Sequence, residues 1–247
     1  MVLKMFEIKD KVAIVTGGAG GIGKATVEAI LAKGGLPVIA DWDENLGKKT
    51  AEELNVPFFK VDVSNEEQVK NVVEETVKLY GHLDIIVNNA GICPAKLFHE
   101  YTTEEYRHII GVNQDGVVWG CKYAINEFLK QGTPGAIVNV SSMMGIISNP
   151  YTPFYSTTKF GLRGLTKSIA IAYGRQGIRA NTIHPGHVDT AIGGKGCGEE
   201  AYKYDCEHTP VGRTGVPEEI AHAIIFTIEN EFLTGTEIIV DGGWTIQ

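Results

Sequence analysis

The feature that most constrains this chain is a glycine-rich turn that directly follows its first apolar run. The run Val12–Thr16 has the composition of a buried strand, and the next residues read Gly-Gly-Ala-Gly-Gly-Ile-Gly before a helical pattern begins near Ala25. Gly18, Gly20 and Gly23 meet the G-x-G-x-x-G spacing, in which a backbone without side chains lets a pyrophosphate approach amide groups at a helix N-terminus. The sequence therefore predicts a strand–turn–helix unit that binds a dinucleotide.

The same alternation of short β-branched runs and longer amphipathic stretches continues almost to the end of the chain. It is typical of βαβ units around a parallel sheet. One helix is expected over Asn65–Tyr80, where apolar residues recur every three or four positions and Ser64 or Asn65 can cap the start. The strands are expected at Val12–Thr16, Pro37–Asp41, Phe58–Val61, Ile85–Asn88, Ala136–Val140, Arg179–His184 and Glu237–Val240.

With 247 residues and no linker-like interruption, the chain is expected to form one α/β domain over residues 1–247. The predicted architecture is a Rossmann-like, doubly wound parallel sheet of about seven strands with helices on both faces. The one long stretch without a regular pattern runs from Pro185 to Pro217 and is rich in glycine. We expect a substrate lid over residues 186–216, with the glycines at 193–198 as its hinge.

Asp41, at the end of the second expected strand, bears on the choice of cofactor. An acidic residue at this place in a dinucleotide-binding fold binds the hydroxyls of the adenosine ribose. Its charge repels a 2′-phosphate, and residues 18–20 supply no Arg or Lys to neutralise one. NAD is therefore expected rather than NADP. The alternative is that Asp41 only caps a helix that starts near Asp43.

Charge and hydropathy narrow the range of partners. The formal net charge is −8, and no clustered basic segment offers the positive field that nucleic-acid binding needs. No apolar run approaches the roughly 20 residues that span a bilayer, and charged residues interrupt the first eleven positions. We expect a cytoplasmic protein with a small-molecule substrate and with neither a nucleic-acid nor a membrane partner.

Further blocks follow the glycine turn in a fixed order. After Thr16-Gly17-x-x-x-Gly21-x-Gly23 come Asp62-Val63, Asn88-Asn89-Ala90-Gly91 and, near residue 185, Pro-Gly-His-Val-Asp-Thr. Together these blocks resemble the short-chain dehydrogenase/reductase family in its compact form, and the likeness continues through residues 213–219 and 234–243.

The resemblance implies an oxidoreductase that uses a nicotinamide dinucleotide. It also implies a homotetramer, in which subunits pair through the helices containing residues 116–129 and 155–173. The cofactor contacts that it implies are Gly17, Gly20, Gly21, Ile22, Gly23, Asp41, Trp42, Asp62, Val63, Asn89, Ala90, Gly91, Tyr155, Lys159, Pro185, Gly186, Val188 and Thr190.

Tyr155 and Lys159 carry the expected chemistry. They lie four residues apart and therefore on one face if the segment is helical. A free phenol titrates near ~10, and a neighbouring ammonium stabilises the phenolate and lowers that pKa. Lys159 is therefore expected to make Tyr155 a usable general acid and base. Taken alone, the same pair is more commonly a solvated helix face.

Ser142 and Asn113 complete the expected catalytic set. Ser142 lies thirteen residues before Tyr155, just past the strand that ends near Val140, where open α/β sheets bind ligands. Its hydroxyl can hold the reacting oxygen, and the resemblance selects it over Ser141. By the same resemblance, Asn113 anchors a water in a proton relay through Lys159.

The substrate is expected to be a largely apolar or cyclic secondary alcohol or ketone. Met143, Met144, Tyr151 and Phe154 bracket the catalytic pair, and no arginine nearby offers a fork for a carboxylate or phosphate. No metal is expected, because His184 and His187 lack further ligands at convincing spacing. Two alternatives stay open: a reductase of 3-oxoacyl thioesters, and a dinucleotide-binding sensor without catalysis.

Overall fold

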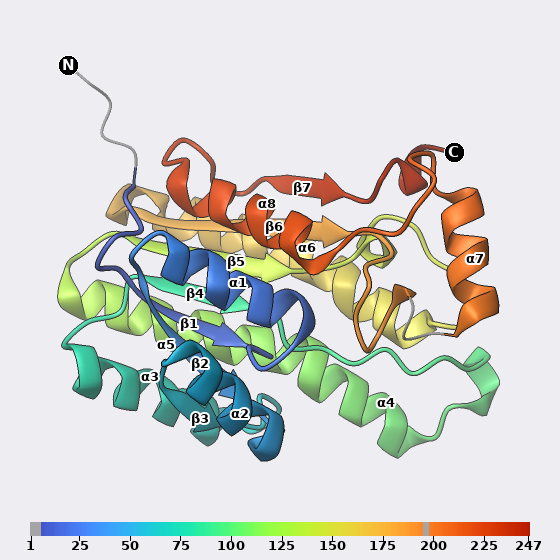
Figure 1. Ribbon diagram of the computed structural model, residues 1–247. Helices are drawn as coiled ribbons and strands as arrows, with labels where there is room; N and C mark the ends of the chain where they lie inside the picture. Colours follow the sequence, from blue (N-terminus) through green and yellow to red (C-terminus); the bar gives the residue numbers. More distant parts are fainter. Residues whose placement is uncertain (1–5, 195–197) are drawn as a thin grey trace.

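The computed structural model describes residues 6–194 and 198–247, and its central element is one parallel sheet (Figure 1). The strand order is β3-β2-β1-β4-β5-β6-β7, and each neighbouring pair is parallel. The predicted Rossmann-like fold is confirmed, and the expected strand ends differ from the observed ones by at most one residue. The observed strands are β1 Val12–Thr16, β2 Leu36–Asp41, β3 Phe58–Lys60, β4 Ile85–Asn88, β5 Gly135–Val140, β6 Ile178–Pro185 and β7 Glu237–Val240.

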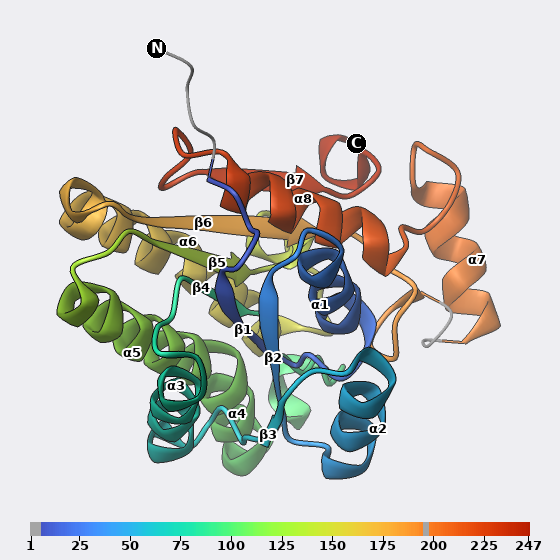
Figure 2. The same ribbon diagram turned by 60° about the vertical axis from the view of Figure 1, so that its left-hand side comes forward.

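Helices cover both faces of the sheet (Figure 2). One face carries α1 (Gly21–Ala32), α2 (Glu44–Leu54) and α8 (Pro217–Glu229), and the other carries α3 (Glu66–Tyr80), α5 (Gly116–Gln131) and α6 (Pro153–Tyr173). Each face has its own apolar core, because β-strand side chains alternate between the two sides. Since both faces are buried, strands such as β1 are apolar along their whole length.

Helix starts follow from local capping chemistry. The side chain of Asn65 accepts a hydrogen bond of 3.2 Å from the Gln68 N–H, so Asn65, and not Ser64, caps α3. The Asp43 carboxylate caps α2 by accepting from the N–H groups of Asn45 and Leu46. The alternative that Asp41 caps this helix is therefore wrong.

The described part of the stretch from Pro185 to Pro217 contains more regular structure than the sequence indicates. It contains a helix, α7 (Glu199–His208), which stands beyond the carboxyl ends of the strands (Figure 1). Sequence reasoning missed it because its residues lack an apolar stripe; Asp205 is its one buried residue. The expected hinge includes residues 195–197, which lie outside the described residues.

A short α4 (Thr103–Ile110) leads through a π-helical turn, Gly111–Asp115, directly into α5. Across residues 6–194 and 198–247, no helix combines the length and apolarity that a membrane span requires.

Candidate active site

The site forms at the point in the sheet where the chain stops adding strands on one side of β1 and begins adding them on the other. From β1 the chain moves outward through β2 and β3, and then returns to pair β4 on the other side of β1. In open α/β sheets, the crevice at this switch point, outside the carboxyl ends of the strands, is where ligands bind. The glycine turn follows β1 and the Asn-Asn-Ala-Gly block follows β4, so the topology makes them neighbours.

The glycine turn is closely packed and needs its glycines. Gly17 has φ +63°, in the left-handed region. A Cβ added at Gly23 would lie 1.9 Å from the Gly17 carbonyl oxygen, so this close approach excludes any side chain. Gly20 is the N-cap of α1, with no side-chain cap and no acidic residue in the first turn. The exposed amides and positive dipole of α1 therefore fit a diphosphate.

Hydrogen bonds join the glycine turn to the Asn-Asn-Ala-Gly block after β4. The Thr16 hydroxyl accepts from the N–H groups of Asn89 and Ala90 at 3.0 and 3.1 Å. The Asn89 side chain donates to the carbonyls of Thr16 and Gly17 at 3.0 and 3.2 Å. These bonds fix the two loops that form the floor of the expected cofactor site.

The Asp41 side chain lies directly beside the turn. Its two carboxylate oxygens accept from the Ala19 N–H at 3.0 Å and the Asp43 N–H at 3.1 Å, and the residue is 8% exposed. The adjacent Trp42 is 75% exposed. The acidic side chain of Asp41 therefore lies beside the glycine turn, next to a large exposed aromatic ring.

The remaining expected cofactor residues have defined neighbours at this end of the sheet. The Asp62 carboxylate accepts from the Ser64 N–H and hydroxyl, and Val63 packs against Gly116. Thr190 lies against the turn, since a Cβ at Gly21 would be 3.1 Å from its methyl group. Pro185 ends β6, Gly186 packs on Asp241, and Val188 bridges to Gly215, while Ile22 lies in the first turn of α1.

Helix α6 brings together Tyr155 and Lys159, one turn apart. The Lys159 Nζ lies 5.5 Å from the Tyr155 ring centroid and donates to the Val140 carbonyl at 2.8 Å. Ser142, directly past β5, hydrogen bonds the Tyr155 phenol through its hydroxyl, which also accepts from the Met144 N–H at 3.1 Å. Three of the four expected catalytic side chains therefore meet at the end of β5.

Burial controls the protonation of this pair. It raises the pKa of the Tyr155 phenol, an effect that its hydrogen bond with Ser142 partly offsets. Burial also lowers the pKa of Lys159 from 10.5 to about 8. Desolvation is the largest influence on the pKa of the Tyr155 phenol, and the Lys159 ammonium is directed at the Val140 carbonyl.

Asn113 lies in the π-helical turn between α4 and α5 and is fully buried. Its side-chain oxygen accepts from the Ile92 N–H and its amide donates to the Ile92 carbonyl, both at 2.8 Å. A Cβ at Gly91 would be 3.3 Å from Asn113 Oδ1 and 3.6 Å from Lys159 Nζ, so these groups converge beside the expected cofactor site. Isolated π-turns are frequent at functional sites.

The four residues expected to line the substrate pocket have different environments. Met143 and Met144 are buried next to Ser142, and Tyr151 is exposed at the surface. Phe154 packs its ring against Phe98, Tyr101 and Tyr106, with centroid distances of 4.8–5.3 Å. Phe154 therefore belongs to an aromatic cluster that joins α4 and α6.

Two features near the site were not predicted from the sequence. Cys93 is an electrostatic neighbour of both Tyr155 and Lys159, and its place two residues after the Asn-Asn-Ala-Gly block was the available signal. His187 pairs with Asp205 of α7 at 2.9 Å, linking the expected nicotinamide segment to α7. Sequence spacing gives no sign of this second pair.

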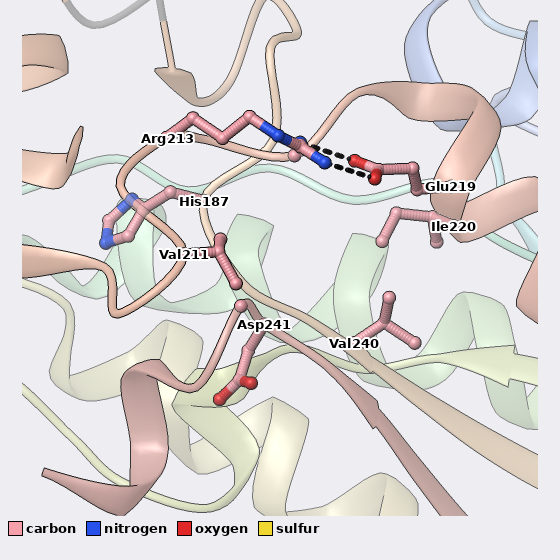
Figure 3. Close-up of a pocket in the computed structure, with 9 residues that line it drawn as sticks. His187, Val211, Arg213, Glu219, Ile220, Val240 and Asp241 are labelled. Carbon is pink, nitrogen blue, oxygen red and sulfur yellow. Dashed lines mark hydrogen bonds and ion pairs between the residues drawn. The ribbon is translucent and has the colours of Figure 1, made fainter.

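His187 also lines a small pocket of about 120 Å³, shown in Figure 3. Arg213 and Glu219 form a bidentate ion pair at its wall, with the nearer contact at 2.6 Å. None of the four expected catalytic residues lines this pocket. In the described part of the chain, no group of three or more His, Cys, Asp or Glu side chains is arranged to hold a metal ion.

Known proteins match this chain over nearly its whole length. A family model described as Enoyl-(Acyl carrier protein) reductase matches residues 17–245. An uncharacterized oxidoreductase of Thermotoga maritima is 39% identical over 251 residues, covering 97% of this chain and 98% of the relative. An NADP-dependent (R)-specific alcohol dehydrogenase of Lentilactobacillus kefiri is 34% identical, covering 98% of this chain and 99% of the relative.

A solved structure extends the similarity to three dimensions. The crystal structure of gox2181 matches this chain with a TM-score of 0.93 at 33% sequence identity, and the match covers 100% of both chains.

Proposed function

Because the chain belongs to the short-chain dehydrogenase/reductase family, whose members bind a nicotinamide dinucleotide, we propose that it interconverts a secondary alcohol and a ketone with NAD. The observation that carries the proposal is the meeting of Tyr155, Ser142 and Lys159 at the end of β5, beside the glycine turn. A sensor without catalysis has no need of a half-buried phenol hydrogen bonded to a serine hydroxyl at this end of the sheet.

Each residue has a defined task in this proposal. Ser142 holds the reacting oxygen of the substrate, and the Tyr155 phenol takes the proton from the alcohol or returns it to the ketone. Lys159 stabilises the phenolate that forms, and Asn113 anchors the water through which the proton leaves. A nicotinamide dinucleotide held at the glycine turn would accept or supply the hydride.

NAD is proposed over NADP because of Asp41. Its carboxylate lies beside the glycine turn, where a 2′-phosphate of NADP meets a fixed negative charge. The L. kefiri relative is named as NADP-dependent, so membership of the family does not decide between the two cofactors. The Asp41 carboxylate is the feature of this chain that favours NAD.

The proposed substrate is apolar or cyclic, such as a cyclic alcohol or a hydroxysteroid. Met143 and Met144 border Ser142, and the nearby Arg163 is held by Glu237 and the Gly145 carbonyl. Arg163, eight residues after Tyr155, is the one arginine in the sequence between Ser142 and Tyr173 that offers a fork for an anionic group. A relative from Thermotoga maritima, named as a 3-oxoacyl-[acyl-carrier-protein] reductase and 36% identical over 97% of this chain, favours a second candidate, a 3-oxoacyl thioester reductase.

We further propose a single catalytic domain that includes the lid at residues 186–216, and assembly as a homotetramer. The His187–Asp205 pair supports the lid, because it ties α7 to the segment that follows β6. Exposed apolar side chains on the long helices, such as Ile171 of α6 at 85% exposure, support the assembly.

One kinetic experiment tests cofactor and substrate together. Oxidation of a panel of secondary alcohols is followed with NAD and with NADP, pairing each apolar cyclic alcohol with an acidic or polyhydroxylated counterpart. We expect kcat/KM at least about tenfold higher with NAD, and Asp41→Ala to narrow that ratio. Equal efficiency with both cofactors contradicts the NAD proposal, and a preference for acidic, polyhydroxylated or thioester substrates contradicts the pocket proposal.

A further inference from the structure

A buried histidine lies directly behind the expected catalytic serine. His184 of β6 is 0% exposed, and its Nδ1 lies 2.8 Å from the Ser142 carbonyl oxygen. Since a carbonyl oxygen only accepts hydrogen bonds, Nδ1 must carry a proton and donate it. The ring therefore holds the peptide group that follows Ser142.

The other ring nitrogen of His184 faces an ion-pair network. Nε2 is buried without a hydrogen-bond partner in the described structure and lies 3.4 Å from a carboxylate oxygen of Glu237 on β7. Glu237 is bound by the Nε of Arg163 at 2.6 Å and by the Nζ of Lys167 at 2.5 Å. Burial holds the pKa of His184 below its usual value, which favours the neutral ring with its single proton on Nδ1.

Arg163 connects this network back to the serine. Its Nη1 donates to the Gly145 carbonyl at 3.0 Å. Ser142 and Gly145 bound the short turn Met143–Gly145, whose chain reversal is closed by the bond from the Gly145 N–H to the Ser142 carbonyl. His184 thus holds the carbonyl at the start of the turn and Arg163 holds the carbonyl at its end, while Glu237 binds Arg163 and lies 3.4 Å from Nε2 of His184.

We propose that His184, Arg163 and Glu237 form a clamp that positions the Ser142 hydroxyl for the reaction at Tyr155. This inference rests on the proposed role of Ser142 and adds three positioning residues that do not touch the substrate. The turn also contacts α6, since a Cβ at Gly145 would be 2.8 Å from the Lys159 carbonyl oxygen. Displacement of the turn therefore moves the Ser142 hydroxyl relative to Tyr155 and Lys159. Misplacement of a catalytic group by about 1 Å lowers the reaction rate on the order of 10²-fold.

Two substitutions of His184 distinguish a role in positioning Ser142 from a role in packing the core. In His184→Asn, the amide nitrogen occupies nearly the place of Nδ1 and retains a donor for Ser142. In His184→Gln, the amide reaches the place of Nε2 beside Glu237, and the donor to Ser142 is lost. We expect His184→Asn to keep kcat within about fivefold of wild type and His184→Gln to lose about 10- to 100-fold, with KM and NADH binding changed less than about twofold.

A second pair of variants tests the contact that Arg163 makes with the turn. Arg163 lies nearer the protein surface than His184, so its substitution disturbs folding less. Arg163→Met removes the donor to Gly145 and is expected to lower kcat about tenfold at unchanged KM. Lys167→Met is the matched control, because Lys167 also binds Glu237 but touches no carbonyl of the turn. It is expected to keep kcat within about twofold.

The outcomes distinguish this inference from the function on which it rests. If wild type oxidises secondary alcohols and both His184→Gln and Arg163→Met keep full kcat, the clamp is wrong and the proposed function stands. If kcat falls as far in His184→Asn as in His184→Gln, and the two variants have equal melting temperatures, then the hydrogen bond donated to the Ser142 carbonyl does not support catalysis and the clamp is wrong. If wild type shows no such oxidation, the function fails and the clamp with it.

Discussion

Single residues show most clearly where sequence reasoning stops. The spacing of Tyr155 and Lys159, and the distance back to Ser142, were sufficient to predict which side chains meet. Their protonation was not predictable, because burial of Lys159 and its bond to the Val140 carbonyl depend on the packed turn after β5. His184 illustrates the same limit, since its only sequence signal was a place before a Pro-Gly pair.

The lowered pKa of Lys159 predicts that this residue reduces stability at neutral pH. A pKa moved from 10.5 to about 8 in the folded protein corresponds to a penalty of about 3 kcal/mol below pH 8. Between pH 8 and 10.5 the unfolded chain binds the proton more tightly than the folded protein, so stability rises with pH and the penalty fades. Lys159→Met should therefore melt above wild type at pH 7, by a margin that narrows toward pH 10.

Thermal melts followed by circular dichroism across this pH range check the prediction. Lys78→Met, at a side chain that is 76% exposed, is the surface control and should show no such trend. A Lys159→Met variant that melts below wild type at pH 7 would contradict the reading of this buried charge.

Helices and strands whose apolar residues recur at a regular spacing were predictable from the sequence. Elements that only their backbone hydrogen-bond pattern defines were not. Helix α3 was predicted because its apolar residues recur at helical spacing and Asn65 caps it. The π-turn at Gly111–Asp115 leaves no compositional trace, because one shifted hydrogen bond defines it. Helix α7 lacks an apolar stripe and is held instead by contacts such as His187–Asp205.

The turn that joins β1 to α1 gives a prediction at this scale. Gly23→Ala should lower the free energy of unfolding by roughly 2 kcal/mol or more and abolish dinucleotide binding, because the new Cβ meets the Gly17 carbonyl oxygen. Gly20→Ala is the matched change three residues earlier. Its Cβ would meet only Leu46 Cδ2 at 3.6 Å, so stability should stay within about 0.5 kcal/mol. Urea unfolding compares the two, and equal stability would overturn the steric argument.

At the scale of the whole molecule, the sheet was predictable and the assembly was not. The parallel pairing of the strands follows from βαβ connections and from the need to bury both faces of the sheet. Contacts between subunits depend on exposed surfaces, and on those surfaces the apolar residues are scattered without a period. The proposed homotetramer therefore rests on family resemblance and on the exposed faces of α5 and α6.

Sedimentation velocity tests the assembly. Wild type is expected to sediment as a tetramer at micromolar concentration, and Ile171→Glu on α6 is expected to shift it to smaller species, because a charge is then buried in the contact. Leu79→Glu, at a 54% exposed position on α3, is the control and should leave the tetramer intact. A monomeric wild type at every concentration would contradict the proposal.

The central claim is that Tyr155 is the general acid and base of an NAD-linked oxidoreductase, and Tyr155→Phe tests it most directly. The substitution removes one hydroxyl and keeps the ring in its packed position. NADH formation from the best secondary alcohol, measured beside NADH binding by fluorescence, separates catalysis from cofactor binding. The account predicts a fall of about 10³-fold in kcat with the dissociation constant for NADH within about twofold of wild type. A variant that retains substantial turnover would contradict it.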